Sequence, residues 1–306
     1  MQTTHKPYVL KGVDYDILTL AKEYHFLTVS QIVSIRYKEG SLSAVQGRLR
    51  QLFHGGYLLR RELPHTGPGH AEYIYSLYST GQKALKELGY DMPSRIRKSE
   101  FQELTLPHLS HLLQVNDVLI AARLLPQTVP QITLQEWRHD IELHKTPATI
   151  SYTAHVQPKK QITEQTTIIP DAWLDFRYTA TDGKPKRRCL VLELDRGTTA
   201  QKIIRQKLRA YTHYSVSEQY THIFGTDVIV VVYLTTKPQR AQQLSEWCEQ
   251  ELTLQHQTHE ADLFRFASLP PSTPDPLTLF CTDICTIPFQ KTPTSLLWQT
   301  TGNQTH

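Results

Sequence analysis

The stretch RRCLVLELDRGTTAQKIIRQKLRAY, from Arg187 to Tyr211, decides the fold of this chain. An apolar run, Cys189 to Leu194, leads into an acidic pair and a turn of small residues, and then into a segment rich in cations. The apolar run predicts a buried strand, and the segment after the turn predicts a helix capped by Thr198 or Thr199. The sequence therefore predicts a strand, a turn and a helix, with acids at the end of the strand.

Three carboxylates are expected near this strand end. Alternation with a period of two residues places Val191, Glu193 and Asp195 on one face, and its two carboxylates lie about 7 Å apart along the strand. The segment IIPDAWLDF, residues 168–176, adds Asp171 directly after a proline, which is tolerated at a strand start. If the two segments pair, the three acids converge, and a divalent metal or a shared proton relieves their repulsion. The alternative is that they are ordinary exposed acids at strand ends.

The order of these residues resembles the replication-relaxation family of plasmid and mobile-element proteins. The resemblance rests on Pro170-Asp171, on ELDRGT at residues 193–198, on Lys207 and Tyr211 of the next helix, and on HLLQVND at residues 111–117. It covers most of the chain. It implies a second domain similar to restriction endonucleases, with a PD-(D/E)xK core in which an Asp and a Glu bind magnesium and a Lys helps to activate water.

One departure from that core bears on activity. Asp195 occupies the position, two residues after the Glu, where the resemblance places the lysine. Either a basic residue nearby has taken over that role, Lys207, Lys202 or Arg196, or cleavage has been lost. For an active version the resemblance implies Asp171, Glu193 and Asp195 as magnesium ligands, and Lys207 or Lys202 as the catalytic cation.

Length and composition suit an ordinary soluble chain of two domains. The chain has 306 residues and a net charge of +4, and its longest apolar run, Val228 to Leu234, is too short to span a bilayer. We therefore expect a cytoplasmic protein without a membrane partner. The four cysteines are scattered, which favours free thiols over a zinc site. Residues 1–104 hold 14 Lys and Arg against 10 Asp and Glu, and the remainder 19 against 19, so the excess charge lies in the N-terminal part.

The N-terminal part predicts a winged helix-turn-helix domain over residues 1–89. Two alternating strands flank a Gly/Pro-rich turn and make a hairpin, and three helices precede it. The helices are expected at 14–24, 28–33 and 41–53, the strands at 57–63 and 72–78, and a further helix at 79–88.

The helix at 41–53 is the expected recognition helix for double-stranded DNA. Its buried stripe is predicted to comprise Leu42, Val45, Leu49, Leu52 and Phe53. The residues left to contact bases or phosphates are Ser43, Gln46, Arg48 and Arg50, and the hairpin adds Arg60, Arg61 and His70. The competing interpretation is a winged helix used for protein contacts or dimerisation.

The rest of the chain predicts a mixed α/β domain with helices on both faces of a sheet. We expect a linker at 90–104, this domain at 105–269, and a Pro/Thr-rich extension at 270–306. The predicted helices are 106–125, 199–216 and 239–252; the further strands are 132–137, 228–234 and 263–266; residues 149–165 are predicted to be a polar excursion. On the helix at 199–216, Ile203 is predicted to point inward, and Lys202, Arg205 and Arg209 form a cation row on the outer side.

Three functions follow as hypotheses. The first is a DNA-binding protein of a plasmid or mobile element, acting in replication, relaxation or mobilisation, whose nuclease-like domain has lost activity and serves as a scaffold or homodimer surface. The second is an active Mg²⁺-dependent endonuclease or nickase. The third is a protein–protein adaptor. Beyond DNA, replication or mobilisation proteins are the expected partners.

Overall fold

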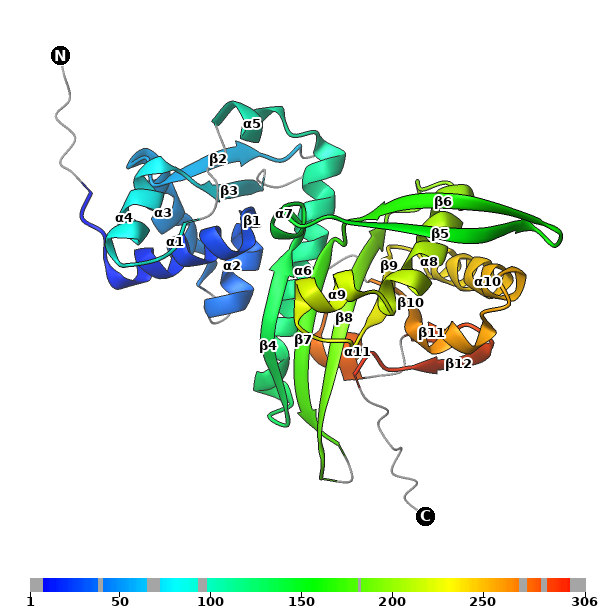
Figure 1. The fold of residues 1–306 in the computed structure, drawn as a ribbon. Helices are drawn as coiled ribbons and strands as arrows, with labels where there is room; N and C mark the ends of the chain where they lie inside the picture. Colours follow the sequence, from blue (N-terminus) through cyan, green and yellow to red (C-terminus); the bar gives the residue numbers. More distant parts are fainter. Residues whose placement is uncertain are drawn as a thin grey trace. The chain divides into compact units, whose positions relative to one another are not determined.

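A computed structural model describes residues 8–37, 41–64, 72–92, 98–180, 183–269, 274–281 and 285–297 of the protein (Figure 1). The contacts divide the chain into two compact units, Met1–Ile120 and Ala121–His306. Within the described ranges, none of the helices combines the length and the apolar character that crossing a bilayer requires. The boundary between the two units, after Ile120, lies beyond the linker predicted at 90–104.

The first unit has the element order of a winged helix, as predicted. Its three-stranded antiparallel sheet has the order β1-β3-β2, and helices precede and follow the hairpin. The elements are α1 (Gly12–Tyr24), β1 (Leu27–Thr28), α2 (Val29–Arg36), α3 (Leu42–His54), β2 (Leu58–Glu62), β3 (Tyr73–Leu77) and α4 (Ser79–Glu87). The predicted turn of the wing lies outside the described residues.

Local sequence explains the two central helices of this unit. The Thr28 hydroxyl accepts a hydrogen bond from the Gln31 backbone N–H, and the Gln31 side chain accepts one from the Thr28 N–H, which makes a capping box at the start of α2. On α3, Val45, Leu49 and Leu52 form the buried stripe. The same prediction is wrong for Leu42, which lies in the first turn of the helix and is 46% exposed, and for Phe53, which is only partly buried.

The predicted linker contains part of the first unit. Residues Lys98–Glu103 form helix α5, whose Phe101 is fully buried and stacks on Phe26 with ring centroids 5.8 Å apart. Helix α6 (Leu106–Thr128) follows, and its Asn116 amide donates to the carbonyls of Tyr24 (3.1 Å) and Phe26 (2.5 Å). These two carbonyls flank His25, a non-glycine residue with φ of 61°. The HLLQVND segment thus fixes the end of α1 and lies in the first unit, whereas the domain expected at 105–269 would have included it.

The second unit is built on a seven-stranded mixed sheet with the order β12-β11-β10-β9-β8-β7-β4. β8, β9 and β10 are parallel, and the strands on either side of this group are antiparallel to it. The strands are β4 (Ile132–His139), β7 (Ala172–Thr179), β8 (Pro185–Asp195), β9 (Val230–Thr235), β10 (Phe264–Ser268), β11 (Cys285–Ile287) and β12 (Gln290–Thr294). All six residues of β9 are buried, as the continuous apolar run predicted.

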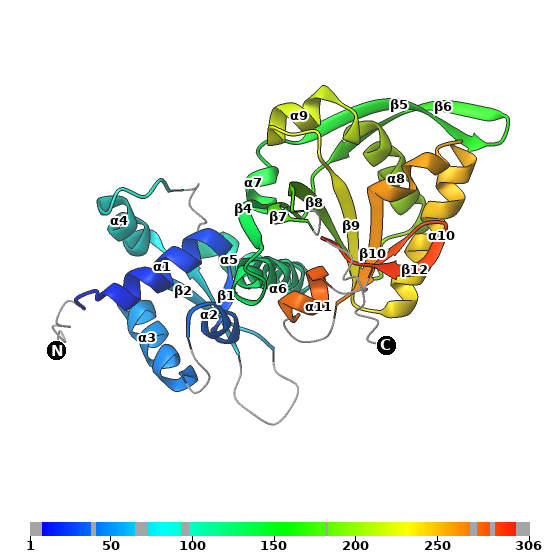
Figure 2. The ribbon, with the colours of Figure 1, turned by 90° about the horizontal axis from the view of Figure 1, so that it is seen from below.

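Helices cover both faces of this sheet. They are α7 (Asp140–Leu143), α8 (Gln201–Ser215), α9 (Glu218–Phe224), α10 (Pro238–Leu254), the 3-10 helix η1 (Thr258–Leu263) and α11 (Pro276–Cys281). Figure 2 shows α8 and α10 on one side of the central strands and α11 on the other. On the first side, Cys189 and Val191 of β8 pack in the core beneath α8 and α10. On the opposite side, Phe280 of α11 contacts Phe176 of β7, with ring centroids 5.3 Å apart.

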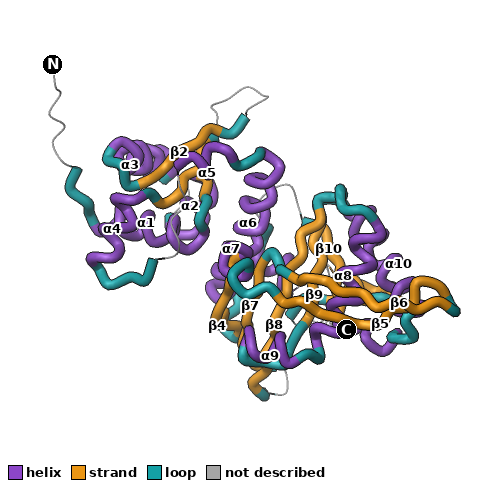
Figure 3. Tube along the Cα trace, turned by 45° about the horizontal axis from the view of Figure 1, so that its top comes forward, coloured by secondary structure: helices purple, strands orange, loops and turns teal. Residues whose placement is uncertain are grey.

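The range predicted to be a polar excursion is instead a long antiparallel ribbon, β5 (Ala148–Gln157) with β6 (Lys160–Ile168). It forms a separate two-stranded sheet (Figure 3). The prediction is wrong because Ile150, Tyr152 and Ala154 alternate with hydroxyl side chains, so that one face is apolar and buried although the segment is polar on average. In the extension beyond residue 270, apolar residues of α11 and of the segment after β12 are buried, so they pack back on the unit: Leu279, Phe280, Cys281, Leu296 and Leu297.

Candidate functional site

A buried carboxylate with two partners lies near the end of β8. The Glu193 side chain is 7% exposed, and its Oε2 lies 2.6 Å from Nζ of Lys207. The hydroxyl of Tyr211 donates to Oε1 of Glu193 at 2.5 Å. Lys207 and Tyr211 are four residues apart on α8, and this spacing places both side chains over the same patch of the sheet.

Asp171 adjoins this pair, as the sequence predicted. It precedes β7, which pairs with β8 so that Ala172 lies opposite Leu192. Its Oδ2 accepts a hydrogen bond of 2.6 Å from the backbone N–H of Leu194, and its own N–H donates to the Leu192 carbonyl at 3.0 Å. Asp171 is therefore held beside Glu193 by the backbone on either side of that residue.

The three side chains interact electrostatically. Burial raises the pKa of Glu193, Lys207 opposes that shift, and the charge of Asp171 adds to it. Burial alone would lower the pKa of Lys207, but the carboxylates of Glu193 and Asp171 outweigh it and raise that pKa. Lys207 is consequently a firmly charged cation set against two acids.

Asp195, the third predicted acid, faces another partner. Its Oδ2 is 2.6 Å from Nε of Arg240 on α10, and the same guanidinium donates to the Thr199 carbonyl at 2.7 Å. Arg240 also stacks over Trp247, 4.8 Å from the ring centroid. The sequence did not predict Arg240, which lies 45 residues beyond Asp195 and in no recognisable motif.

These contacts do not fit a magnesium site with three carboxylate ligands. Both oxygens of Glu193 already accept hydrogen bonds, and Asp195 is bound to Arg240. In the part of the chain that the structure describes, no group of three or more His, Cys, Asp or Glu side chains is placed to hold a metal ion. The arrangement is a pair of acids, Asp171 and Glu193, with one cation, Lys207, bound to Glu193.

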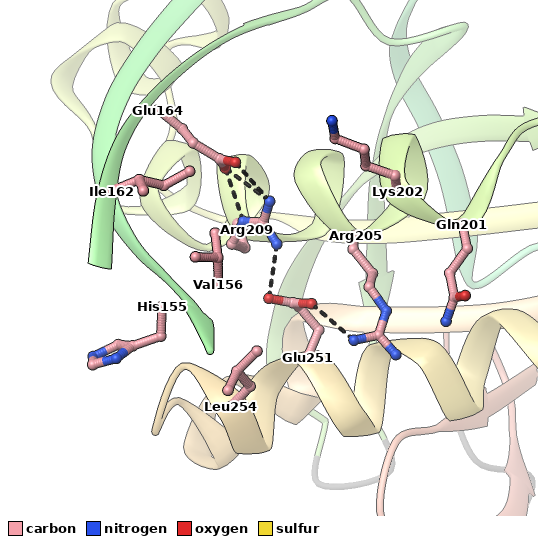
Figure 4. Close-up of a pocket in the computed structure, with 10 residues that line it drawn as sticks. All are labelled: His155, Val156, Ile162, Glu164, Gln201, Lys202, Arg205, Arg209, Glu251 and Leu254. Carbon is pink, nitrogen blue, oxygen red and sulfur yellow. Dashed lines mark hydrogen bonds and ion pairs between the residues drawn. The ribbon is translucent and has the colours of Figure 1, made fainter. Parts of the chain in front are cut away.

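The predicted cation row of α8 lines a hollow of about 590 Å³ between the β5–β6 ribbon, α8 and α10 (Figure 4). Arg209 was expected on a solvated face, but its side chain is only 9% exposed because it binds two carboxylates. Its Nε and Nη2 donate to Glu164 of β6 at 2.9 Å each, and its Nη1 donates to Glu251 of α10 at 2.9 Å. Arg205 lies 3.4 Å from Glu251, whereas Lys202 is exposed and stands apart from these ion pairs. Lys202 therefore belongs to this hollow, and Lys207 is the cation at Glu193.

In the winged helix, the exposed face of α3 presents Ser43, Gln46 and Arg50. Gln46 and Arg50 line a hollow of about 570 Å³ together with residues of α2, β2 and β3. Arg48 points elsewhere: its guanidinium donates to the Tyr8 hydroxyl at 2.8 Å and lies 3.7 Å from the carboxylate of the buried Asp14. It fastens the chain before α1 to α3.

The predicted phosphate contacts of the hairpin also have internal roles. Arg60 lies between two rings, 4.3 Å from the centroid of Phe53 and 4.4 Å from that of Tyr73. Arg61 donates to the carbonyls of Phe101 (3.2 Å) and Leu104 (2.5 Å), which ties α5 to the hairpin. His70 lies outside the described residues.

Comparison with known families adds one match. A family model described as replication-relaxation matches residues 18–228. The chain belongs to the replication-relaxation family. This confirms the resemblance, and the matched range contains α3, Asp171, Glu193 and Lys207 of this replication-relaxation protein.

No curated protein matches the replication-relaxation chain. Among solved structures, it is similar to the crystal structure of Bacillus subtilis PadR in complex with operator DNA. The identity is 17%, the alignment covers 39% of this chain and 75% of that chain, and the TM-score is 0.22. A TM-score of this size does not establish a common fold.

Proposed function

We propose that this replication-relaxation protein binds double-stranded DNA through α3 and acts in the replication, relaxation or mobilisation of a plasmid or mobile element. The observation that carries the proposal is the exposed face of α3. It presents Ser43, Gln46 and Arg50, and the helix contains no Asp or Glu. Gln pairs in a bidentate manner with adenine and Arg with guanine in the major groove, so these are side chains suited to read base edges.

The proposal assigns the other basic residues of the unit a supporting role. Arg48 and Arg61 are engaged within the protein, so their loss would disturb α1 and α5 before it touched DNA. Arg60 is held rigidly between two rings, and its guanidinium lines the same hollow as Gln46 and Arg50. A flanking phosphate contact is the role that this position supports.

The test is DNA binding by the double variant Gln46→Ala, Arg50→Ala. Each bidentate base contact contributes about 1–3 kcal/mol, so the variant should bind a duplex enriched from a random-sequence pool at least about tenfold more weakly than wild type. The loss of one cation should also reduce the salt slope by about 1. Fluorescence anisotropy over a salt series measures both quantities.

A matched control removes the same residue types elsewhere. Gln51→Ala with Arg177→Ala replaces one exposed Gln on the other side of α3 and one exposed Arg of β7, and it should bind as wild type does. Equal binding by the Gln46/Arg50 variant would remove α3 as the recognition helix. No binding by wild type at low salt would leave the protein–protein adaptor as the better function.

The second candidate function is a Mg²⁺-dependent nuclease with a restriction-endonuclease-like second unit. The cluster of Asp171, Glu193 and Lys207 favours it, since two acids and a lysine are the side chains that the family resemblance implies. The occupied oxygens of Glu193 and the diversion of Asp195 to Arg240 favour a site that no longer cleaves.

Incubation with supercoiled plasmid DNA in Mg²⁺ or Mn²⁺ separates the two functions. We expect no nicking by the wild-type protein, because both Glu193 oxygens are bound by Lys207 and Tyr211. Nicking by wild type that Asp171→Asn and Glu193→Gln each abolish would establish a nuclease. Nicking that persists in both variants would indicate a contaminating enzyme.

A further inference from the structure

The β5–β6 ribbon contributes no residue to the cluster of Asp171, Glu193 and Lys207. Its two strands pair over nearly their whole length and join at a two-residue turn, Pro158-Lys159, where Gln157 lies opposite Lys160. One face is apolar, with Ile150, Tyr152 and Ala154 among its buried residues, and it packs against α8. Figures 1 and 3 show the end of the ribbon reaching out beyond the helices that it covers.

The other face of the ribbon is exposed, uncharged and able to form hydrogen bonds. Three exposed cross-strand pairs lie on it: Thr149 with Thr167, Ser151 with Gln165, and Thr153 with Thr163. Hydroxyl and amide groups can both donate and accept hydrogen bonds. A solvated face rich in Thr is common in strands, so this composition alone would indicate no partner.

The distribution of charge along the ribbon indicates an anionic partner. The sole carboxylate between residues 148 and 168 is that of Glu164, and it faces inward, where it accepts from Arg209 and from the Tyr152 hydroxyl. Both lysines of the ribbon, Lys159 and Lys160, are exposed at its tip. The outward surface is thus a hydrogen-bonding ladder with a cationic end and no acid.

We propose that the β5–β6 ribbon is a second DNA contact, in which the polar face enters the major groove and the tip lysines bind phosphates. Two strands lie about 4.8 Å apart, and the major groove, about 12 Å wide, admits a two-stranded ribbon. The major groove of an RNA duplex is too narrow for this. A protein partner is disfavoured because the three cross-strand pairs named above include no aromatic or large apolar side chain to serve as an anchor.

The contact rests on the proposed DNA binding but uses residues of the other unit, so the two can be tested apart. In Lys159→Ala, Lys160→Ala, the salt slope of binding to random-sequence duplexes should fall in magnitude by about 2, with a loss in affinity on the order of tenfold at low salt. Gln165→Glu places a carboxylate on the polar face with little change in shape. It should weaken binding several-fold because it repels phosphate.

The matched control is the double variant Lys186→Ala, Lys237→Ala, which removes one exposed lysine from β8 and one directly before α10. This control should keep the wild-type slope and affinity. The proposal is overturned if the tip variant and this control behave alike, or if Gln165→Glu binds as wild type does. If the tip variant loses affinity but Gln46→Ala, Arg50→Ala does not, the ribbon contact stands and α3 is not the recognition helix. If only the Gln46/Arg50 variant loses affinity, the ribbon contact alone is rejected. Absence of wild-type binding rejects both.

Discussion

Replacing Arg209 with methionine is expected to lower the free energy of unfolding by about 3–5 kcal/mol. The guanidinium joins Glu164 of the ribbon to Glu251 of α10 through three hydrogen bonds of 2.9 Å. The side chain of Glu251 is 2% exposed and that of Glu164 is 14% exposed, so both carboxylates would lose a cation in a poorly solvated place. Urea denaturation followed by circular dichroism measures the change.

Arg205→Met is the matched control for Arg209→Met. It makes the same change one helical turn earlier, at a side chain that is 24% exposed and 3.4 Å from Glu251, and it should cost about 1 kcal/mol or less. Adding Glu164→Gln and Glu251→Gln to Arg209→Met should recover much of the loss, because no uncompensated charge then remains buried. If the two arginine variants prove equally stable, Arg209 is not the residue that fixes the ribbon to α8 and α10.

Replacing Lys207 with methionine should destabilise the protein by about 2–3 kcal/mol at neutral pH, somewhat less than a fully buried pair since Lys207 is 31% exposed. The variant leaves Glu193 beside Asp171 without its cation, which adds to the rise that burial already gives the pKa of Glu193. A carboxyl whose folded pKa is raised destabilises the folded state when it is ionised. The penalty should therefore be largest above that pKa and vanish as the pH falls below the unfolded value of about 4.3.

The wild-type protein should lose stability at high pH, where Lys207 loses its charge. The pKa of Lys207 is raised in the folded state, mainly by Glu193 against the opposing effect of burial. Its stabilising contribution is thus complete below the unfolded value of about 10.4 and is lost as the pH rises through the folded value. Denaturation at several pH values tests both ends. Lys202→Met, at an exposed position of the same helix, should change stability little at any pH, and Lys207→Met with Glu193→Gln should lose the acid-side dependence.

Much of the site could be predicted from short-range pattern. Alternation along β8 placed Val191 and Glu193 on one face, and α8 covers that face in the structure. The proline before Asp171 indicated a strand start, and β7 begins directly after Asp171. The i, i+4 spacing of Lys207 and Tyr211 agreed with their shared contact. These features depend only on the periodicity of helices and strands, which can be read from residue spacing in the sequence.

The remaining features depend on partners far apart in the chain. Arg209 was expected in solvent because an isolated guanidinium is rarely buried, and only the folded chain brings Glu164 and Glu251 to it. Asp195 could not be assigned to Arg240 for the same reason. The ribbon was missed because its buried face amounts to every second residue of a segment that is polar on average.

The bond from Asn116 to the end of α1 determines where the first unit can be excised from the chain. A truncation after residue 89 would discard the amide that holds Tyr24 and Phe26 around the strained His25, together with Phe101, the stacking partner of Phe26. The smallest autonomous fragment should therefore run through α5 and past Asn116, with its boundary near Ile120, where the contacts themselves divide.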